Sequence, residues 1–138
     1  FETPLFVYDE DQLRSRCREA VAAFGEGVVY ATKAFMTTAM ARLAYEEGMR
    51  LDVATGGELF VALQAGVPPD RLVVHGNNKS VKELAAALDA GVGQIVIDSF
   101  VEIERIEALV EAGAPPPKVV IRLTPSAPNT PVRFRCRK

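Results

Sequence analysis

The chain has 138 residues, of which 49% are hydrophobic and 25% charged, and its formal net charge is −2. These are ordinary values for a soluble globular domain and predict a core of ordinary size. No apolar run approaches the roughly 20 residues that span a bilayer, and no signal-peptide pattern opens the sequence, so we expect a cytoplasmic protein without a membrane partner.

Residues 1–25 are predicted to form an extended arm followed by a helix. The apolar run from Pro4 to Tyr8 reads as extended, and we expect it to pair with a strand of a second, β-rich domain outside this chain, because an isolated strand leaves its backbone unsatisfied. The helix begins near Asp11 with Asp9 as its N-cap. Its apolar face consists of Leu13, Cys17, Ala20, Val21 and Phe24.

The two cysteines do not predict a bridged or metal-binding protein. Cys17 and Cys136 are far apart and show no C-x-x-C spacing, which indicates neither a disulfide framework nor a zinc site. We therefore expect Cys17 to be a small core residue and assign no metal ligands.

Residues 26–125 alternate between apolar β-type runs and helical patterns. The runs recur at nearly even intervals and begin near Val28, Leu51, Leu72, Gln94 and Lys118. Three of the helical patterns end at a glycine, which favours a left-handed terminator; these glycines are Gly48, Gly66 and Gly91.

Two helix starts carry a capping-box pattern, Ser80 with Glu83 and Ser99 with Glu102. The periodicity of the last helix separates a packed stripe from a solvated face. The stripe contains Phe100, Ile103, Ile106 and Val110, and the solvated face contains Glu102, Glu104, Arg105 and Glu111.

Strand, helix and strand at this spacing predict right-handed parallel βαβ units in an α/β fold. A doubly wound sheet and a (β/α)8 barrel both satisfy the pattern. The near-constant spacing favours the TIM-like barrel, and because a full barrel needs about 250 residues, we expect only its first half, with five strands at most.

Polar residues follow the predicted strands, where the carboxyl ends of parallel strands form a common rim and sites of barrel enzymes lie. Each has a simpler explanation when taken alone. Asp98 favours the helix start that it precedes, the single histidine is as compatible with a structural role as with a functional one, and the asparagines suit a turn. The rim residues are Lys33, Asp52, His75, Asn77, Asn78, Lys79 and Asp98, and we expect Lys79 to be solvated.

Lys33 and Asp52 as a pair suggest chemistry. A lysine that closes a buried strand loses hydration, which favours the neutral, nucleophilic amine that a Schiff base requires. A carboxylate on the neighbouring strand can orient that amine or form an ion pair with it, although a purely structural buried ion pair remains an alternative. Arg122, on the fifth strand, is a further residue that alternation allows to point into the barrel.

Four stretches together resemble the bacterial diaminopimelate decarboxylases, which are fold-type III enzymes dependent on pyridoxal 5'-phosphate. They are residues 30–35 (YATKAF), 51–59 (LDVATGGEL), 75–80 (HGNNKS) and 95–99 (IVIDS). The resemblance runs in order from about Thr3 to Pro125. Ornithine and arginine decarboxylases share the barrel and the lysine, and alanine racemases use a strand-end lysine in a different sequence, but the double glycine and the 75–80 turn look more like the diaminopimelate branch.

The resemblance implies roles for particular residues. Lys33 matches the lysine that binds the cofactor covalently, Asp52 matches an acidic residue beside it, and Glu58 matches a further acidic position near the pocket. His75 and Asn78 match the family's third-strand turn and are possible pocket residues, to which no direct cofactor role is assigned. The implied reaction is decarboxylation of meso-2,6-diaminopimelate to L-lysine and carbon dioxide, the last step of lysine biosynthesis, by a homodimer.

The chain also departs from that family. The family's phosphate-binding and ring-stacking residues lie on later strands, and its β domain supplies substrate contacts; neither is present. Residues 126–138 diverge into a Pro-rich and then basic tail, which we interpret as a truncated or frame-shifted end and not as a nucleic-acid contact. We therefore expect a fragment that begins inside a longer reading frame and is inactive alone; the alternative is a catalytically inactive binding or interaction fragment.

Overall fold

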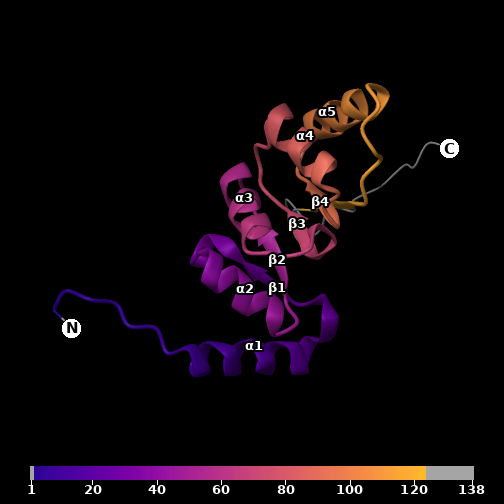
Figure 1. The fold of residues 1–138 in the computed structure, drawn as a ribbon. Helices are drawn as coiled ribbons and strands as arrows, with labels where there is room; N and C mark the ends of the chain where they lie inside the picture. Colours follow the sequence, from indigo (N-terminus) through magenta and orange to yellow (C-terminus); the bar gives the residue numbers. More distant parts are fainter. Residues whose placement is uncertain (1, 124–138) are drawn as a thin grey trace, which may run out of the picture.

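The computed structural model describes residues 2–123 and is organised around a five-stranded sheet (Figure 1). The strands are β1 (Val29–Ala31), β2 (Arg50–Val53), β3 (Leu72–Val74), β4 (Gln94–Ile97) and β5 (Val119–Ile121). The helices are α1 (Glu10–Phe24), α2 (Thr38–Glu46), α3 (Gly56–Gln64), α4 (Val81–Ala90) and α5 (Phe100–Glu111), with short 3-10 turns at Gly25–Gly27, Thr32–Ala34 and Pro69–Arg71. The predicted tail at 126–138, with Cys136, lies outside the described residues.

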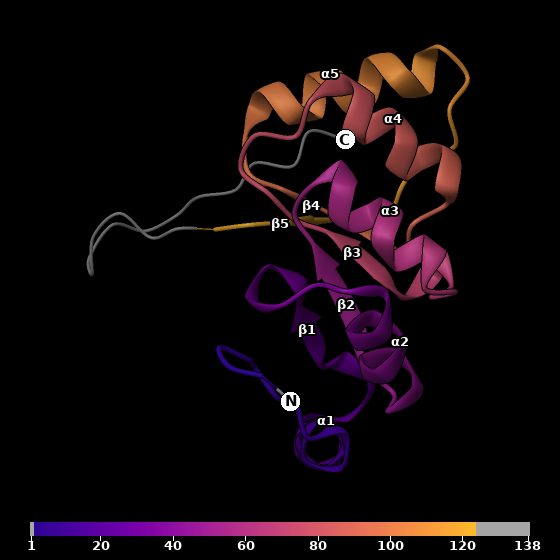
Figure 2. The ribbon, with the colours of Figure 1, turned by 60° about the vertical axis from the view of Figure 1, so that its left-hand side comes forward.

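The order of the strands distinguishes the two architectures that the sequence left open. All pairings are parallel, and the spatial order β1-β2-β3-β4-β5 follows the sequence. A doubly wound sheet reverses its order at a switch point, whereas right-handed crossovers that always advance in one direction place every helix on the same face. Figure 2 shows α2 to α5 along one side of the strands. The predicted partial (β/α)8 barrel is confirmed over these five strands.

The core lies between the sheet and this helical layer. In β2, Leu51 and Val53 are completely buried, while Arg50 and Asp52 alternate with them and are half-buried on the opposite face. The helices contribute Met40, Leu43, Ala44, Leu59, Ala62, Leu84, Ala87, Leu88 and Ile106 to the same core. Cys17 of α1 is also buried there, which confirms its predicted role. The other face of the sheet, which corresponds to the barrel interior, is therefore the one that carries polar side chains.

Local signals placed the helix ends correctly. Asp9 caps α1 by accepting a hydrogen bond from the amide of Gln12 at 3.0 Å. Ser80 and Glu83 form the complete capping box that the sequence predicted for α4. The three terminating glycines adopt positive φ angles, as expected of residues without a Cβ.

Two predictions about α5 are wrong. Phe100 is 85% exposed and so does not belong to the packed stripe, whereas the other three predicted residues, Ile103, Ile106 and Val110, do pack against the core. The physical reason is that Phe100 is the first residue of the helix, at the edge of the sheet, whereas the next turn lies over the core. Glu102, expected on the solvated face, is 1% exposed.

The amino-terminal arm is not a strand in this structure. The segment from Leu5 to Tyr8 is exposed and without regular secondary structure, and the Tyr8 ring stacks on the Phe35 ring with centroids 4.7 Å apart. Its pairing with a strand outside the chain stays a prediction. Among residues 2–123, no helix has the length and apolar character needed to cross a bilayer.

Candidate functional site

The carboxyl ends of β1, β2 and β3 lie level with one another because the register aligns Ala31 with Asp52 and Asp52 with Val73. Side chains of aligned residues project to the same face, and here that face is the barrel interior. A cavity of about 280 Å³ lies at this edge, close to the lower limit of small-molecule pockets, roughly 300 Å³. Its lining residues are Ala31, Lys33, Asp52, Ala54, His75, Gly76, Asn77 and Arg122.

Lys33 reaches the cavity from the 3-10 turn that follows β1. Thr32 is completely buried, and its hydroxyl donates to the carbonyl of Asp52 at 2.7 Å, which ties the turn to the next strand. The hydroxyl of Tyr30 donates to the carbonyl of Phe35 at 2.8 Å and closes the turn from the other side. The backbone around Lys33 is therefore held on both sides.

Lys33 itself is exposed, so the prediction of a lysine buried at the end of its strand is wrong for this chain. Lys33 lies beyond the last residue of β1, and among the five described strands β1 is flanked by β2 alone. Its amine is thereby open to a ligand in the cavity.

The carboxylate of Asp52 contacts a histidine where the sequence suggested a lysine. Its Oδ2 atom lies 3.3 Å from Nδ1 of His75, and both side chains are partly exposed. The expected ion pair between Lys33 and Asp52 is not among the ion pairs of residues 2–123. The two residues share the cavity, but the structure pairs Asp52 with His75.

The fifth strand contributes a cation to the cavity wall. Arg122 lines the cavity, as alternation allowed, and its Nη1 atom lies 3.4 Å from Oδ2 of Asp98. The Asp98 side chain is only 9% exposed. Asp98 therefore pairs with the arginine that follows β5, besides preceding the N-cap of α5.

Two of the possible pocket residues, Glu58 and Asn78, do not line this cavity. The Glu58 carboxylate accepts hydrogen bonds from the amides of Ala54 at 2.6 Å and Thr55 at 3.1 Å, within the capping box of α3. Asn78 is exposed and does not line the cavity, whereas Asn77 does. In an extended segment every second side chain lies on the same side. Asn77 is two residues after His75, so continuing the alternation of β3 would have indicated Asn77 as a cavity residue.

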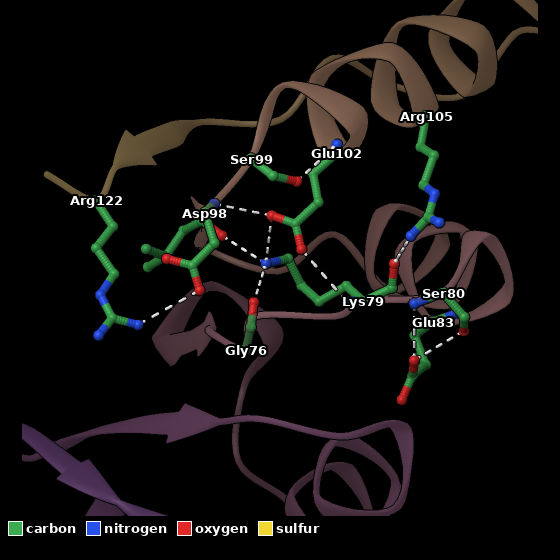
Figure 3. Close-up of polar contacts among 10 residues, drawn as sticks. Gly76, Lys79, Ser80, Glu83, Asp98, Ser99, Glu102, Arg105 and Arg122 are labelled. Carbon is green, nitrogen blue, oxygen red and sulfur yellow. Dashed lines mark hydrogen bonds and ion pairs between the residues drawn. The ribbon is translucent and has the colours of Figure 1, made fainter. Parts of the chain in front are cut away.

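The largest surprise near the site is Lys79, which is 2% exposed although a solvated side chain was predicted. Its Nζ atom donates to the carbonyls of Gly76 at 2.6 Å and Val96 at 2.7 Å and to Oε2 of Glu102 at 2.9 Å (Figure 3). All three donors of the ammonium are thus satisfied, which is the condition for burying one.

Glu102 is held in its ionised form by the same cluster. Its carboxylate accepts from the amide of Asp98 at 2.9 Å and from the amide of Lys79 at 3.3 Å (Figure 3). Burial by itself raises the pKa of the Glu102 carboxyl, but the Asp98 amide and the Lys79 ammonium and amide outweigh burial, so the pKa lies below its ordinary value. The predicted box at Ser99 is consequently one-sided: Ser99 accepts from the Glu102 amide, but the carboxylate bonds elsewhere.

The donor set of the cavity fits an aldehyde that carries an anionic group. An exposed primary amine can condense with a carbonyl, a carboxylate holds the imidazole beside it, and a guanidinium places positive charge on the β5 wall. Among the cavity residues, Lys33 is the one that can form a covalent bond to such a ligand, and Arg122 is suited to its anion.

Comparisons with known proteins agree on one group of enzymes. Residues 10–136 match the family model described as "Pyridoxal-dependent decarboxylase, pyridoxal binding domain". Diaminopimelate decarboxylase of Mycobacterium tuberculosis is 58% identical over 126 residues, covering 90% of this chain and 28% of the relative. The Bacillus subtilis enzyme of that name is 45% identical over 130 residues, covering 91% of this chain and 30% of the relative.

Solved structures give the same picture. Diaminopimelate decarboxylase from Helicobacter pylori, complexed with L-lysine, superposes with a TM-score of 0.83 at 28% identity, covering 89% of this chain and 32% of that one. A lysine/ornithine decarboxylase from Vibrio vulnificus, complexed with putrescine, superposes with a TM-score of 0.73 at 27% identity, covering 83% and 31% of the two chains. This chain therefore spans less than a third of the proteins that it matches, and within that span it belongs to the pyridoxal-dependent decarboxylases, as part of their pyridoxal-binding domain.

Proposed function

We propose that the chain is the amino-terminal part of a diaminopimelate decarboxylase. The complete enzyme removes the carboxylate at the D-centre of meso-2,6-diaminopimelate and releases L-lysine and carbon dioxide. The observation that carries the proposal is the cavity at the carboxyl edge of β1 to β3, where an exposed lysine lies with an aspartate and a histidine in a chain of this family.

The substrate assignment rests on the relatives. The sequence relatives named here, at 58% and 45% identity, are both diaminopimelate decarboxylases, whereas the superposed structures do not separate the two classes, with 28% identity for a diaminopimelate decarboxylase and 27% for the lysine/ornithine decarboxylase. An ornithine-type or arginine-type decarboxylase is therefore the weaker alternative. The 138 residues alone are expected to be inactive, because a half barrel leaves one side of the cavity without a wall.

Pyridoxal 5'-phosphate, when bound, supplies the electron sink that decarboxylation requires. The residues of this chain supply part of the site that holds it. Lys33 offers the amine that binds the cofactor's carbonyl carbon and can exchange with the amine of a substrate. Asp52 orients the imidazole of His75, and Arg122 places positive charge at the cavity.

Reductive labelling tests the role of Lys33. The chain is mixed with pyridoxal 5'-phosphate, reduced with borohydride and mapped by mass spectrometry, with the exposed Lys82 and Lys118 as internal references. Lys33 is expected to be labelled at lower cofactor concentration than either reference, and Lys33→Arg should lose only that label. Equal labelling of all exposed lysines would contradict the assignment.

A chimaera tests whether this segment supports the decarboxylation chemistry. Residues 2–123 replace the matching segment of the Mycobacterium tuberculosis relative, and carbon dioxide release from meso-diaminopimelate is measured. Release that is lost in the Lys33→Ala chimaera is the expected result. An inactive but folded chimaera would contradict the proposal, and release by the unfused 138 residues would show that the fragment is active by itself.

The completed enzyme is expected to be a cytoplasmic homodimer with an amino-acid substrate and no nucleic-acid partner. Light scattering of the full-length protein tests the dimer, and a monomeric mass at working concentration would contradict it.

A further inference from the structure

The loops after β3 and β4 carry much of the site. His75 and Asn77 line the cavity from the first loop, and Asp98 holds Arg122 from the second. Loops of this kind are normally the mobile parts of a barrel. Their side chains need a fixed backbone if a ligand is to meet them in one geometry.

The Lys79–Glu102 cluster joins these two loops directly. The Lys79 ammonium binds the carbonyl of Gly76, next to His75, and the carbonyl of Val96 in β4. The Glu102 carboxylate binds the amide of Asp98. Neither side chain lines the cavity, so the cluster acts on it only through the backbone.

Two further contacts hold the same loop. Arg105 of α5 donates to the carbonyl of Lys79 at 2.6 Å (Figure 3). Gly76 approaches the end of β2 so closely that a Cβ atom there would lie 2.9 Å from the carbonyl oxygen of Ala54. The loop is thus held against β2 on one side and tied to β4 and α5 on the other.

The stability of the fold does not by itself explain why the ion pair between Lys79 and Glu102 is buried below the two loops. Replacing a buried ion pair by apolar side chains of similar volume is often neutral or stabilising. Such residues would not, however, bind two carbonyls and two amides in a fixed arrangement, which the charged pair does. We infer that Lys79 and Glu102 are positioning residues of the candidate site, which set the places of His75, Asn77 and Asp98 by locking the two loops together.

The inference rests on the proposed function for its meaning, but its test does not require activity. The chain contains one histidine, so the ring cross-peaks of His75 in a carbon–proton NMR spectrum are unambiguous reporters of the first loop. Amide exchange at Asp98 reports the second. Three variants are compared: Glu102→Gln, the double variant Lys79→Met with Glu102→Leu, and Glu47→Gln as the control.

The control makes the same chemical change far from the rim. Glu47 accepts from Arg14 at 2.8 Å and from Arg18 at 2.6 Å, between α1 and α2, and its side chain is 10% exposed. Glu47→Gln should leave the His75 cross-peaks and the Asp98 amide unchanged. Comparing Glu47→Gln with Glu102→Gln therefore shows whether the changes at His75 and Asp98 require the loss of the Glu102 carboxylate or follow the loss of any carboxylate in an ion pair.

In Glu102→Gln and in the double variant, we expect the His75 cross-peaks to move or broaden. The Asp98 amide should exchange at least about tenfold faster, because its hydrogen-bond acceptor, the Glu102 carboxylate, is weakened or removed. Labelling of Lys33 by pyridoxal 5'-phosphate should keep its parental level in the control and fall in both rim variants. The double variant is informative because its melting temperature is expected to stay near that of the parent while these signals change.

Cross-peaks of His75 and exchange of Asp98 that match the parent in folded Glu102→Gln would overturn the inference, whatever the double variant does. If the double variant does not fold, Glu102→Gln decides alone. If the parent is not labelled at Lys33, the cofactor assignment fails, but the histidine and amide signals still decide whether the pair positions the loops.

Discussion

Lys33 follows β1 and Lys79 follows β3, so both lie near the carboxyl edge of one parallel sheet, yet their environments are opposite. Lys33 is exposed beside an open cavity, whereas Lys79 is 2% exposed and bonded to two carbonyls and a carboxylate. The difference follows from the sheet order. Among the five described strands β1 has β2 as its one neighbour, whereas β3 lies between β2 and β4, and β4 and α5 supply acceptors around the turn that holds Lys79.

The comparison shows how a parallel sheet divides two tasks between residues of one type. A lysine amine that reacts with a ligand must be accessible to that ligand. A lysine amine that fixes the backbone must donate all of its hydrogen bonds to protein acceptors. A buried ammonium without such partners would be costly. Reactivity is therefore expected at Lys33, and structural specificity at Lys79.

The largest expected effect is on stability, from truncating each lysine in turn. Lys79→Met leaves the Glu102 carboxylate buried and unpaired, and we expect a loss of about 3–5 kcal/mol in the free energy of unfolding. Lys33→Met changes an exposed side chain, and we expect a change within about 0.5 kcal/mol. Urea denaturation of the two variants measures both values. Equal losses would mean that the two lysines do not differ in the way described.

The second prediction concerns the pH dependence of the ion pair between Lys79 and Glu102. Glu102→Gln removes a charge-assisted hydrogen bond and is expected to cost on the order of 1–3 kcal/mol at neutral pH. Because the pKa of Glu102 is lower in the folded than in the unfolded chain, the ionised carboxyl stabilises the fold above its ordinary value of 4.5, and this contribution is lost as the pH falls below that value.

Denaturation of the parent and of Glu102→Gln at a series of pH values checks this. The difference in unfolding free energy should be constant above pH 5 and should shrink as the pH is lowered. A difference that persists unchanged to low pH would show that the charge of Glu102 is not its source.

The third prediction concerns the loop that carries Lys79. Gly76→Ala places a Cβ atom 2.9 Å from the carbonyl oxygen of Ala54, so the backbone must shift, at an expected cost of about 1–3 kcal/mol. Gly27→Ala is the matched control, because no atom lies within 4 Å of the added methyl group and its φ angle is not positive. Calorimetry should show a lower melting temperature for the first variant than for the second.

The smallest effect on stability is expected for a substitution in the cavity that Lys33 lines. Asp52→Asn removes the charge opposite His75, but both side chains are partly exposed, so the loss of stability should not exceed about 1 kcal/mol. The His75 ring signals should nevertheless change, because its 3.3 Å partner is altered. Unchanged ring signals would indicate that Asp52 and His75 are not in contact in solution.

Much of the fold was predictable because its signals are local. Asp9, Ser80 and the terminating glycines act on backbone groups within one turn of themselves. The strands β2 to β4 are short apolar runs that a parallel sheet buries, and their even spacing indicated the barrel. Phe100 shows the limit of periodicity, since a stripe does not reveal where the sheet beneath a helix ends.

The site was predictable in part. Lys33 and His75 follow their strands, Asp52 lies near the end of β2, and the three share the cavity because the ends of parallel strands meet at one edge. Glu58 does not line the cavity, because its carboxylate bonds the backbone of its own helix start, including the amide of the cavity residue Ala54, and its role near the pocket stays a prediction. The burial of Lys79 carries no sequence signal near it, since its partner Glu102 lies 23 residues further along the chain.

The amino-acid sequence by itself determined where the strands begin to within about a residue, where most helices end, which lysine resembles a cofactor-binding residue, and that the strands are parallel. The tertiary structure alone decided which polar side chains face the cavity and which are buried. The reason is physical: caps, terminators and apolar runs act over a few neighbouring residues, whereas the burial of a charge depends on acceptors that only the packing of β4 and α5 against the β3 loop brings within 3 Å.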